Sequence, residues 1–162
     1  MTYEKLLKEA LQHDIDIYER PLSPRIKGLY SDNVIWINKR IESNVKKACI
    51  LAEELGHYHT SAGDILDQSQ IINRKQERLA RTWAYKKLVP LSKIIDAYKK
   101  GINSRHEFAE FLEITEQFLL EAIHAYQNEY GTHVNIDRYI IQFNPLSVTE
   151  MFKDSKGVKQ YG

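Results

Sequence analysis

Apolar residues recur every three or four positions in several stretches of the chain. These stretches cover residues 1–12, 43–59, 73–89, 91–100 and 104–130. A period of three to four residues places the apolar side chains on one face of a helix. The pattern therefore predicts helices in all of these stretches, with a short break inside the last one.

Shorter apolar runs between the helices predict strands. Residues 15–18 form one such run, and residues 27–30 and 34–37 flank the polar sequence Ser-Asp-Asn. Two apolar runs around a polar turn are typical of a β-hairpin. The second strand of this hairpin carries apolar side chains on both faces, so we expect both faces to be covered. Residues 134–143 contain one or two further short strands.

Capping residues indicate where two of the helices begin. Ser43 or Asn44 can cap the helix over 43–59, because both side chains accept hydrogen bonds from free backbone N–H groups. Asn73, with Gln76 three residues later, resembles a capping box and predicts that the next helix begins there. The buried stripe expected on that helix consists of Leu79, Ala80, Trp83, Ala84 and Leu88.

These elements predict an α+β fold that is mainly helical, with a small β-hairpin or sheet packed on the helix over 43–59. A length of 162 residues suits a single domain with a core of its own. We expect this domain to span residues 1–148, with a helical C-terminal part over 91–131. The polar segment 149–162 is expected to be a flexible tail.

Composition narrows the classes of function. Hydrophobic residues make up 43% of the chain and charged residues 28%, and the formal net charge is +1. This balance is typical of a soluble protein without a strong field for nucleic acid or acidic lipid. No signal-type or membrane-spanning apolar run is visible, so we expect a cytoplasmic protein without a membrane partner. Cys49 is the single cysteine, so a metal site must be built from His, Asp and Glu.

The helix over 43–59 contains the sequence Ile-Leu-Ala-Glu-Glu-Leu-Gly-His-Tyr-His at residues 50–59. This is the zinc-peptidase pattern H-E-x-x-H with glutamate in place of the first histidine. Glu53 and His57 lie four apart on one helix face, where such a pair grips a metal ion, and Glu54 stands where the pattern has the base. Carboxylate oxygen is a common zinc ligand. A solvated Glu53–His57 ion pair has the same spacing, but the apolar neighbours argue against a surface that faces water.

Glu77 lies beside the buried stripe of the next helix, one turn before Arg81. An i,i+4 ion pair between the two would contribute only about 0.2–0.5 kcal/mol. Alternatively, Glu77 supplies a third metal ligand from a neighbouring helix. The sequence leaves both interpretations open at this point.

Two of these stretches resemble motifs of the ImmA/IrrE family of metallo-endopeptidases. Residues 50–59 resemble the active-site helix of that family, which usually reads I-L-A-H-E-L-G-H. Residues 77–84, followed by Leu-Val-Pro at 88–90, resemble the second motif, E-x-x-A-N-x-F-A with a later proline. The glutamate of the second motif supplies the third zinc ligand in the family. The order of elements is similar over roughly residues 1–130.

The resemblance implies a zincin-like domain with a zinc site formed by Glu53, His57 and Glu77, and with Glu54 as the catalytic base. It also implies a cytoplasmic endopeptidase of the prophage or mobile-element type. Such proteins cleave a helix-turn-helix transcriptional repressor and thereby relieve repression. The expected partner is therefore a protein substrate.

The chain departs from the family motifs at three positions. Glu53 stands where histidine is usual, and Arg81 and Trp83 stand where asparagine and phenylalanine are usual. One imidazole and two carboxylates would acidify a bound water less than two imidazoles and one carboxylate. The oxygen-rich ligand set would hold zinc less tightly and accept manganese or another divalent ion more readily.

Two other residues are alternative metal ligands. Positions 57 and 59 point roughly 200° apart on a regular helix. His59 could therefore share an ion with His57 only if the helix ended or bent after Gly56, and we prefer Glu53. Asp64, in the polar segment that follows, is a further candidate.

Two other functions compete with the protease. Loss of a histidine ligand is also expected in a catalytically degenerate module that binds a repressor without cutting it. Residues 104–130 contain two short helices with a tight junction, which would indicate DNA binding if they formed a helix-turn-helix. Direct binding of nucleic acid is disfavoured, because residues 116–130 contain no Arg or Lys for phosphate contacts.

Overall fold

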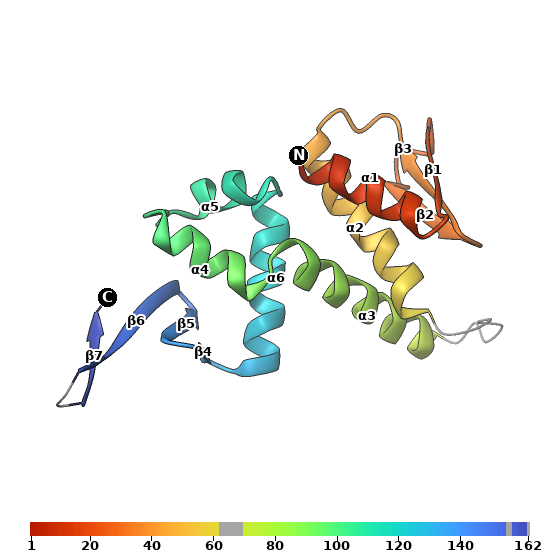
Figure 1. Cartoon of the computed structure of the whole chain (residues 1–162). Helices are drawn as coiled ribbons and strands as arrows, with labels where there is room; N and C mark the ends of the chain where they lie inside the picture. Colours follow the sequence, from red (N-terminus) through yellow and green to blue (C-terminus); the bar gives the residue numbers. More distant parts are fainter. Residues whose placement is uncertain (62–69, 155–156, 162) are drawn as a thin grey trace.

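The computed structural model describes residues 1–61, 70–154 and 157–161. Helices form the middle of the molecule, and two separate sheets lie at its two ends (Figure 1). A mainly helical α+β fold is therefore confirmed. The elements in chain order are α1 (Thr2–Gln12), β1 (Asp16–Arg20), β2 (Gly28–Ser31), β3 (Val34–Asn38), α2 (Asn44–Thr60), α3 (Gln70–Leu88), α4 (Leu91–Lys99), α5 (Arg105–Leu112), α6 (Glu116–Tyr130), β4 (His133–Ile136), β5 (Tyr139–Phe143), β6 (Leu146–Asp154) and β7 (Gly157–Tyr161).

The N-terminal sheet has the strand order β1-β3-β2 and confirms the predicted hairpin. β2 runs antiparallel to β3, and β1 lies parallel to β3 on its other side. Asp32 and Asn33 form the turn with φ values of 49° and 62°, as tight two-residue hairpin turns require. Ile35 and Ile37 are fully buried, whereas Trp36 on the opposite face is only half-buried. One face of β3 is thus fully covered, and the other is covered less than we expected.

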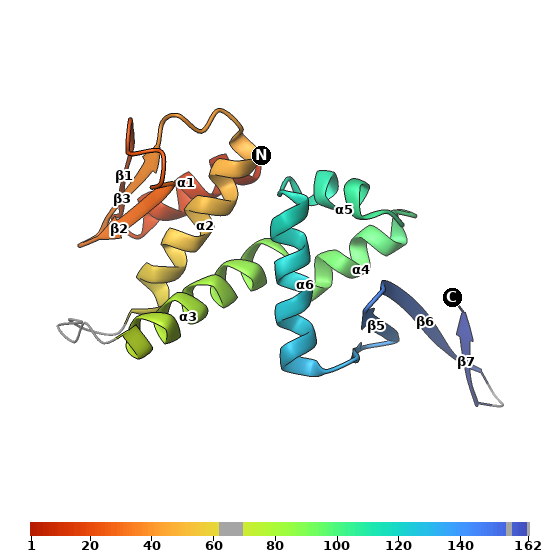
Figure 2. The same ribbon diagram turned by 180° about the vertical axis from the view of Figure 1, so that it is seen from behind.

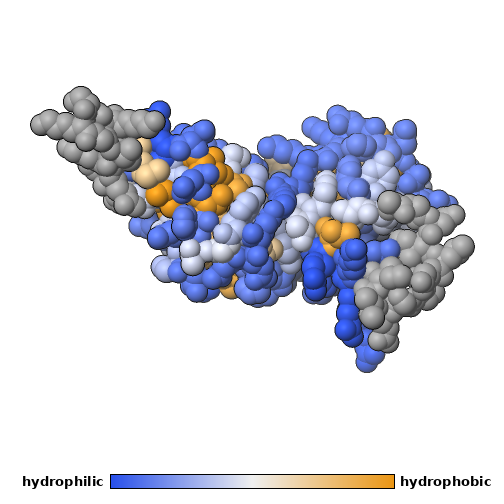
Figure 3. All heavy atoms as spheres, turned by 90° about the horizontal axis from the view of Figure 1, so that it is seen from below, coloured by the Kyte–Doolittle hydropathy of each residue, from blue (hydrophilic) through white to orange (hydrophobic). Residues whose placement is uncertain are grey.

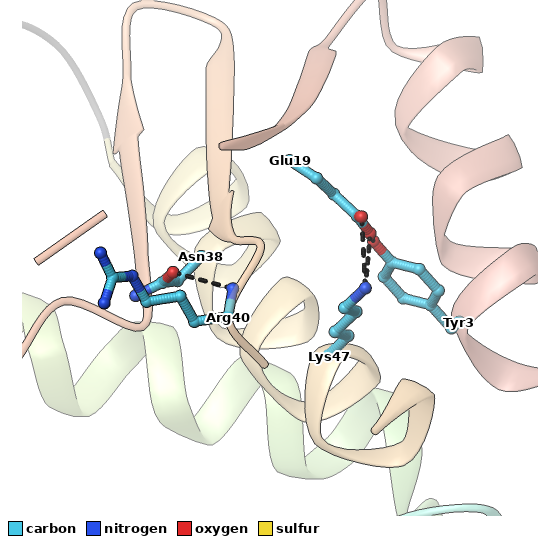
Figure 4. Close-up of polar contacts among 5 residues, drawn as sticks. All are labelled: Tyr3, Glu19, Asn38, Arg40 and Lys47. Carbon is cyan, nitrogen blue, oxygen red and sulfur yellow. Dashed lines mark hydrogen bonds and ion pairs between the residues drawn. The ribbon is translucent and has the colours of Figure 1, made fainter. Parts of the chain in front are cut away.

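Polar contacts tie this sheet to two helices (Figure 4). Glu19 of β1 accepts hydrogen bonds from Tyr3 Oη of α1 at 2.6 Å and from Lys47 Nζ of α2 at 3.1 Å. At the end of β3, Asn38 Oδ1 accepts from the backbone N–H of Arg40 at 3.1 Å. The Asn38 amide donates to three backbone carbonyls of the loop before β2. The Glu19 contacts hold the sheet against α1 and α2, and the Asn38 contacts fix the loops beside β3.

α2 confirms the helix predicted over 43–59. Ser43 is its cap, and its hydroxyl accepts from the backbone N–H of Lys46 at 3.3 Å. Gly56, near the end of α2, lies directly against the backbone carbonyl of Ala80 in α3, where a Cβ atom would clash. Because glycine has no side chain, the two helix backbones can approach each other closely here. This approach sets the geometry of the candidate site.

α3 begins at Gln70, three residues before the predicted start. Asn73 lies inside the helix, so the predicted capping box of Asn73 and Gln76 does not mark its beginning. Helix ends read from sequence are the least certain part of such a prediction, and a capping-type residue can also lie inside a helix. The helix therefore begins before this local start signal.

The buried face of α3 differs in part from the predicted stripe. Ala80, Ala84 and Leu88 are buried as predicted, but Leu79 is 45% exposed. The contact with α2 is centred on Ala80, which turns the neighbouring position toward solvent. Tyr85 is buried in addition, on the side of α3 that faces α6. Figure 2 shows α3 running from the end of α2 to α6, so this helix joins the two halves of the molecule.

The next three helices follow the predicted order. Pro90 precedes α4, and Gly101, with a φ of 77°, follows it. Ser104 and Thr115 cap α5 and α6, and their hydroxyls accept from backbone N–H groups at 3.2 and 3.0 Å. Glu113, with a φ of 56°, forms the break between the two helices. None of the described helices has both the length and the apolar character needed to cross a membrane.

The C-terminal sheet has the order β4-β5-β6-β7, with every neighbouring pair antiparallel. β4 and β5 confirm the strands predicted within residues 134–143. Most of β6 and all of β7 lie within 149–162, the polar segment that we expected to be a flexible tail. Pairing of β6 with β5 and with β7 satisfies the backbone of this polar segment, which the side-chain pattern could not reveal. Figure 3 shows hydrophobic residues gathered at this end of the molecule.

Candidate functional site

His57 of α2 and Glu77 of α3 come together at the centre of the candidate site. His57 Nε2 lies 3.2 Å from Glu77 Oε1, and the two side chains are 21% and 53% exposed. His57 follows Gly56, and Glu77 precedes Ala80 by about one helical turn. The backbone contact between Gly56 and Ala80 therefore brings the two side chains together. Within the described part of the chain, Glu77 pairs with His57 rather than with Arg81.

A separation of 3.2 Å between these two atoms suits ligands of one shared ion. Zinc ligands lie about 2.0–2.2 Å from the metal in a tetrahedron, which places two ligand atoms about 3.3 Å apart. The same distance also fits a direct hydrogen bond between the His57 imidazole and the Glu77 carboxylate, so the distance alone does not distinguish the two. Imidazole nitrogen and carboxylate oxygen are both ordinary zinc ligands, so the chemistry of the two donors also fits. His57 and Glu77 therefore fit a metal site formed between two helices.

Several carboxylates crowd around this pair. Glu53 is half-buried one turn before His57, and burial is the main cause that raises the pKa of its carboxyl. The positive charge of Arg81 acts in the opposite direction, and the negative charges of Glu121 and Glu77 raise the pKa further. Carboxylates that repel one another in a partly dry site are stabilised by a nearby cation. The electrostatics of the site therefore favour a bound cation.

Glu54 faces the N-terminal sheet. Burial, with a smaller effect of the Glu53 and Glu77 charges, raises the pKa of Glu54 to about 7. A Cβ atom on Gly28 of β2 would lie 3.2 Å from Glu54 Oε1 and 2.7 Å from Ile50 Cγ2. Gly28 therefore lets β2 pass close over the carboxylate. No motif includes Gly28, and its signal in the sequence is only that a glycine within a strand often marks a close approach.

A family model described as Peptidase_M78, IrrE N-terminal-like domain, matches residues 10–124. The chain belongs to this family. The match contains both sequence motifs, together with α2, α3 and part of α6. It confirms the resemblance to the ImmA/IrrE proteins and identifies a metallopeptidase-like domain. A comparison with curated proteins gives no match.

Within this Peptidase_M78 domain, Glu53 is placed less closely than the other two predicted ligands. Among the residues that the structure describes, no group of three ligand atoms within 4.8 Å of one another includes Glu53. Its carboxylate would have to turn toward His57 and Glu77 to complete a three-ligand set. The role of Glu53 as a metal ligand therefore stays a prediction.

His59 faces a different part of the Peptidase_M78 domain. α2 continues as a helix past Gly56 to its end at Thr60, so the bend that would turn His59 toward the first site is not found. Its ring instead stacks on Trp83, with ring centroids 4.5 Å apart, and meets the ring of His13 edge-on at 5.1 Å. Burial lowers the pKa of His59. Asp64 lies outside the described residues.

A pocket of about 610 Å³ opens between α3 and α6 beside Glu77. Glu121 of α6 projects toward α3, where its carboxylate accepts hydrogen bonds from Tyr85 Oη at 3.1 Å and from Gln117 Nε2 at 2.8 Å. No motif marks Glu121 in the sequence, so only the fold shows its proximity to the site. The lining residues are Asn73, Arg74, Glu77, Arg78, Arg81, Thr82, Tyr85, Glu121, His124, Ala125 and Asn128.

Proposed function

We propose that this Peptidase_M78 domain is a metal-dependent endopeptidase of the ImmA/IrrE type. The observation that carries the proposal is the 3.2 Å approach of His57 and Glu77, which come from two separate motifs on two helices. His57, Glu77 and Glu53 would hold a zinc ion or, given the oxygen-rich set, manganese or another divalent ion. When bound, such an ion supplies Lewis-acid polarisation of a carbonyl and lowers the pKa of a water.

Glu54 is the general base in this proposal. Its carboxylate takes the proton of the attacking water at one oxygen and later gives it to the leaving amine. General bases work best when their pKa lies near the working pH, and burial raises the pKa of Glu54 to about 7. The approach of β2 at Gly28 keeps one side of the carboxylate covered, which supports both its orientation and the raised pKa.

The proposed substrate is a helix-turn-helix repressor of the phage type. This part of the proposal comes from the ImmA/IrrE family, whose cytoplasmic members cut such repressors and relieve repression. The pocket between α3 and α6 supports it, because its 610 Å³ lie beside Glu77 and give room for part of a polypeptide. Three exposed arginines, Arg74, Arg78 and Arg81, and two carboxylates, Glu77 and Glu121, line this pocket, so a polar stretch of substrate with a small excess of negative charge would be favoured there.

A second function is favoured by the pair Glu53 and Arg81. Both residues replace the usual residues of the family motifs, and the charge of Arg81 partly offsets the raised pKa of the half-buried Glu53 carboxyl. A guanidinium that stabilises this carboxylate supplies part of what a metal would supply. The same scaffold could then bind a repressor without cutting it. DNA binding through α5 and α6 is the weakest alternative, because Arg105 and His106 are both paired with Glu116.

The deciding experiment incubates the purified chain with candidate helix-turn-helix repressors, with and without a chelator. Wild type should cleave its repressor, and the chelator should stop the reaction. Glu54→Gln should lower cleavage by about 10²–10⁴-fold while the metal content stays unchanged. Glu4→Gln, an exposed change on α1, is the matched control and should cleave normally.

Three outcomes would count against the proposal. Full activity of Glu54→Gln would remove this residue from the mechanism. Cleavage that survives the chelator would remove the metal dependence. A wild-type protein that binds a repressor, carries no stoichiometric metal and cuts nothing would establish the binding module instead.

A further inference from the structure

We propose a second metal site, built by Glu9, His13 and His59, which binds zinc or a similar transition-metal ion. One ligand atom from each of the three side chains lies within 4.8 Å of the other two. Two imidazoles and one carboxylate form a ligand set that proteins use for zinc with an open fourth position. Imidazole favours zinc, copper and nickel over calcium and magnesium, which defines the class of ion.

The three ligands come from two helices that meet at their C-terminal ends. Glu9 lies in the last turn of α1 and His13 is the residue that caps it, so the two are four apart on one side. His59 lies in the last turn of α2. Helix C-terminal ends carry a partial negative charge from free backbone carbonyls, which favours a cation nearby. The partial negative charges of the two helix ends add at this cluster and favour a cation more than either end would alone.

The ligand side chains are held in place by their neighbours. Trp83 stacks on the His59 ring at 4.5 Å with an angle of 14° between the planes. The rings of His13 and His59 stand at 89° to each other, edge to face, with centroids 5.1 Å apart. Trp83 occupies a position where the family motif has phenylalanine. The indole at this position is thus part of the surroundings of His59.

Glu9 already has one partner, which a bound ion must tolerate. Lys87 Nζ lies 2.6 Å from Glu9 Oε2. A carboxylate has two oxygens, so one can accept from Lys87 while the other faces the ion, and outer hydrogen bonds of this kind orient metal ligands. The positive charge of Lys87 opposes a second cation, so moderate rather than very tight affinity follows.

The second site is separate from the proposed catalytic site. His59 turns toward α1, whereas His57 turns toward Glu77 of α3. A bound ion would connect the end of α1 to the end of α2 and so stabilise the folded chain, because any ligand that binds only the folded state does so. The inference does not depend on peptidase activity, and its test needs no substrate.

The test titrates zinc into the full chain carrying His57→Gln, which removes the nitrogen ligand of the catalytic site. This chain should still bind one zinc ion and should gain thermal stability from it. Adding His13→Gln or His59→Gln should lower zinc affinity at least tenfold and remove the stabilisation. His133→Gln, at an exposed histidine of β4, is the matched control and should change neither result.

Cobalt provides a second readout, because histidine-bound Co²⁺ absorbs visible light according to its ligands. The Co²⁺ spectrum of the His57→Gln chain should change with His13→Gln and with His59→Gln, and not with His133→Gln. Circular dichroism without metal establishes that each variant is folded. The proposal is overturned if the His57→Gln chain binds no zinc, or if the His13 and His59 variants bind it as tightly as the His133 control.

Discussion

Gly56 of α2 lies directly against the backbone carbonyl of Ala80 in α3. Because Gly56 has no side chain, the Ala80 carbonyl can lie against the backbone of α2, and the two longest described helices approach closely at this point. His57 is the next residue along α2, and Glu77 lies about one turn before Ala80 on α3. The pairing of the two predicted ligands is therefore a consequence of one glycine.

Replacement of Gly56 by alanine should destabilise the fold, although alanine is the better helix former. In an open helix, Gly→Ala is expected to stabilise by up to about 1 kcal/mol. Here the new Cβ would meet backbone atoms that cannot rotate away, and overpacking of this kind costs about 1–3 kcal/mol. Urea denaturation of Gly56→Ala and wild type measures the difference. An equal or larger free energy of unfolding in the variant would show that the helices are not in close contact at this point.

Gly28→Ala should lower activity more than stability. The Cβ of alanine would press on Ile50 and on the Glu54 carboxylate, the proposed base. Displacement of a catalytic group by about 1 Å can cost roughly 10²-fold in rate, whereas the strain on a flexible side chain costs only about 1 kcal/mol. The kcat for repressor cleavage and the free energy of unfolding should be measured together. Ser31→Ala, an exposed change on the same strand, is the control.

The elements with strong local signals were predicted well. α2 and the hairpin of β2 and β3 appear where the apolar pattern and the polar turn placed them, because local chemistry decides both. The predicted start of α3 was three residues too late, because a capping-type residue such as Asn73 can also lie inside a helix. β6 and β7 were missed because strand pairing satisfies a backbone whatever the polarity of its side chains.

Only the residues of the candidate site that belong to short sequence motifs were predicted. His57 and Glu77 were identified from their motifs, and the structure brings them together. Glu121 and Gly28 lie outside these motifs, in separate elements that reach the site only through the fold, and only Gly28 carries a local signal, as a glycine within a strand. The partners of His59 were equally hidden, since Glu9 and His13 lie more than 40 residues away in α1.

Glu19→Gln should lower stability at neutral pH, and the effect should disappear in acid. Hydrogen bonding from Tyr3 is the largest cause that lowers the pKa of Glu19 below its ordinary value of 4.5, and Lys47 contributes as well. A lowered pKa in the folded state means that the carboxylate stabilises the fold above pH 4.5, and that this stabilisation is lost as the pH falls through the folded-state pKa.

The size of this effect is modest because the Glu19 side chain is 36% exposed. Solvent screening limits the ion pair to less than about 1 kcal/mol, and the Tyr3 hydrogen bond adds a similar amount at most. Urea denaturation of Glu19→Gln and wild type should therefore differ by about 1 kcal/mol near pH 7. The two proteins should converge near pH 3. A difference that stays constant over this range would assign the effect to packing rather than to charge.

Glu53→His should tighten zinc binding if position 53 is a ligand position. The change would create two imidazoles and one carboxylate, the more usual set for a peptidase zinc. Loss of a residue that only hydrogen-bonds to a metal ligand changes metal affinity by roughly tenfold or more. A change of the ligand itself should therefore raise zinc affinity by at least about tenfold. The measurement belongs in a chain carrying His13→Gln, so that the second proposed site does not contribute. Glu42→His, at an exposed glutamate before α2, is the control.

Arg81→Asn supplies the complementary test of the same position. Removal of a positive charge near Glu53 should favour a divalent cation, so zinc affinity should rise in this variant too. Both changes restore residues that the family motifs usually contain, and together they should tighten zinc binding more than either alone. A fall in affinity with Glu53→His would mean that Glu53 is not a ligand. Arg81→Asn could also lower the free energy of unfolding without raising zinc affinity. In that case Arg81 would be the charge partner of Glu53 in place of a metal, and the binding module would be the better description.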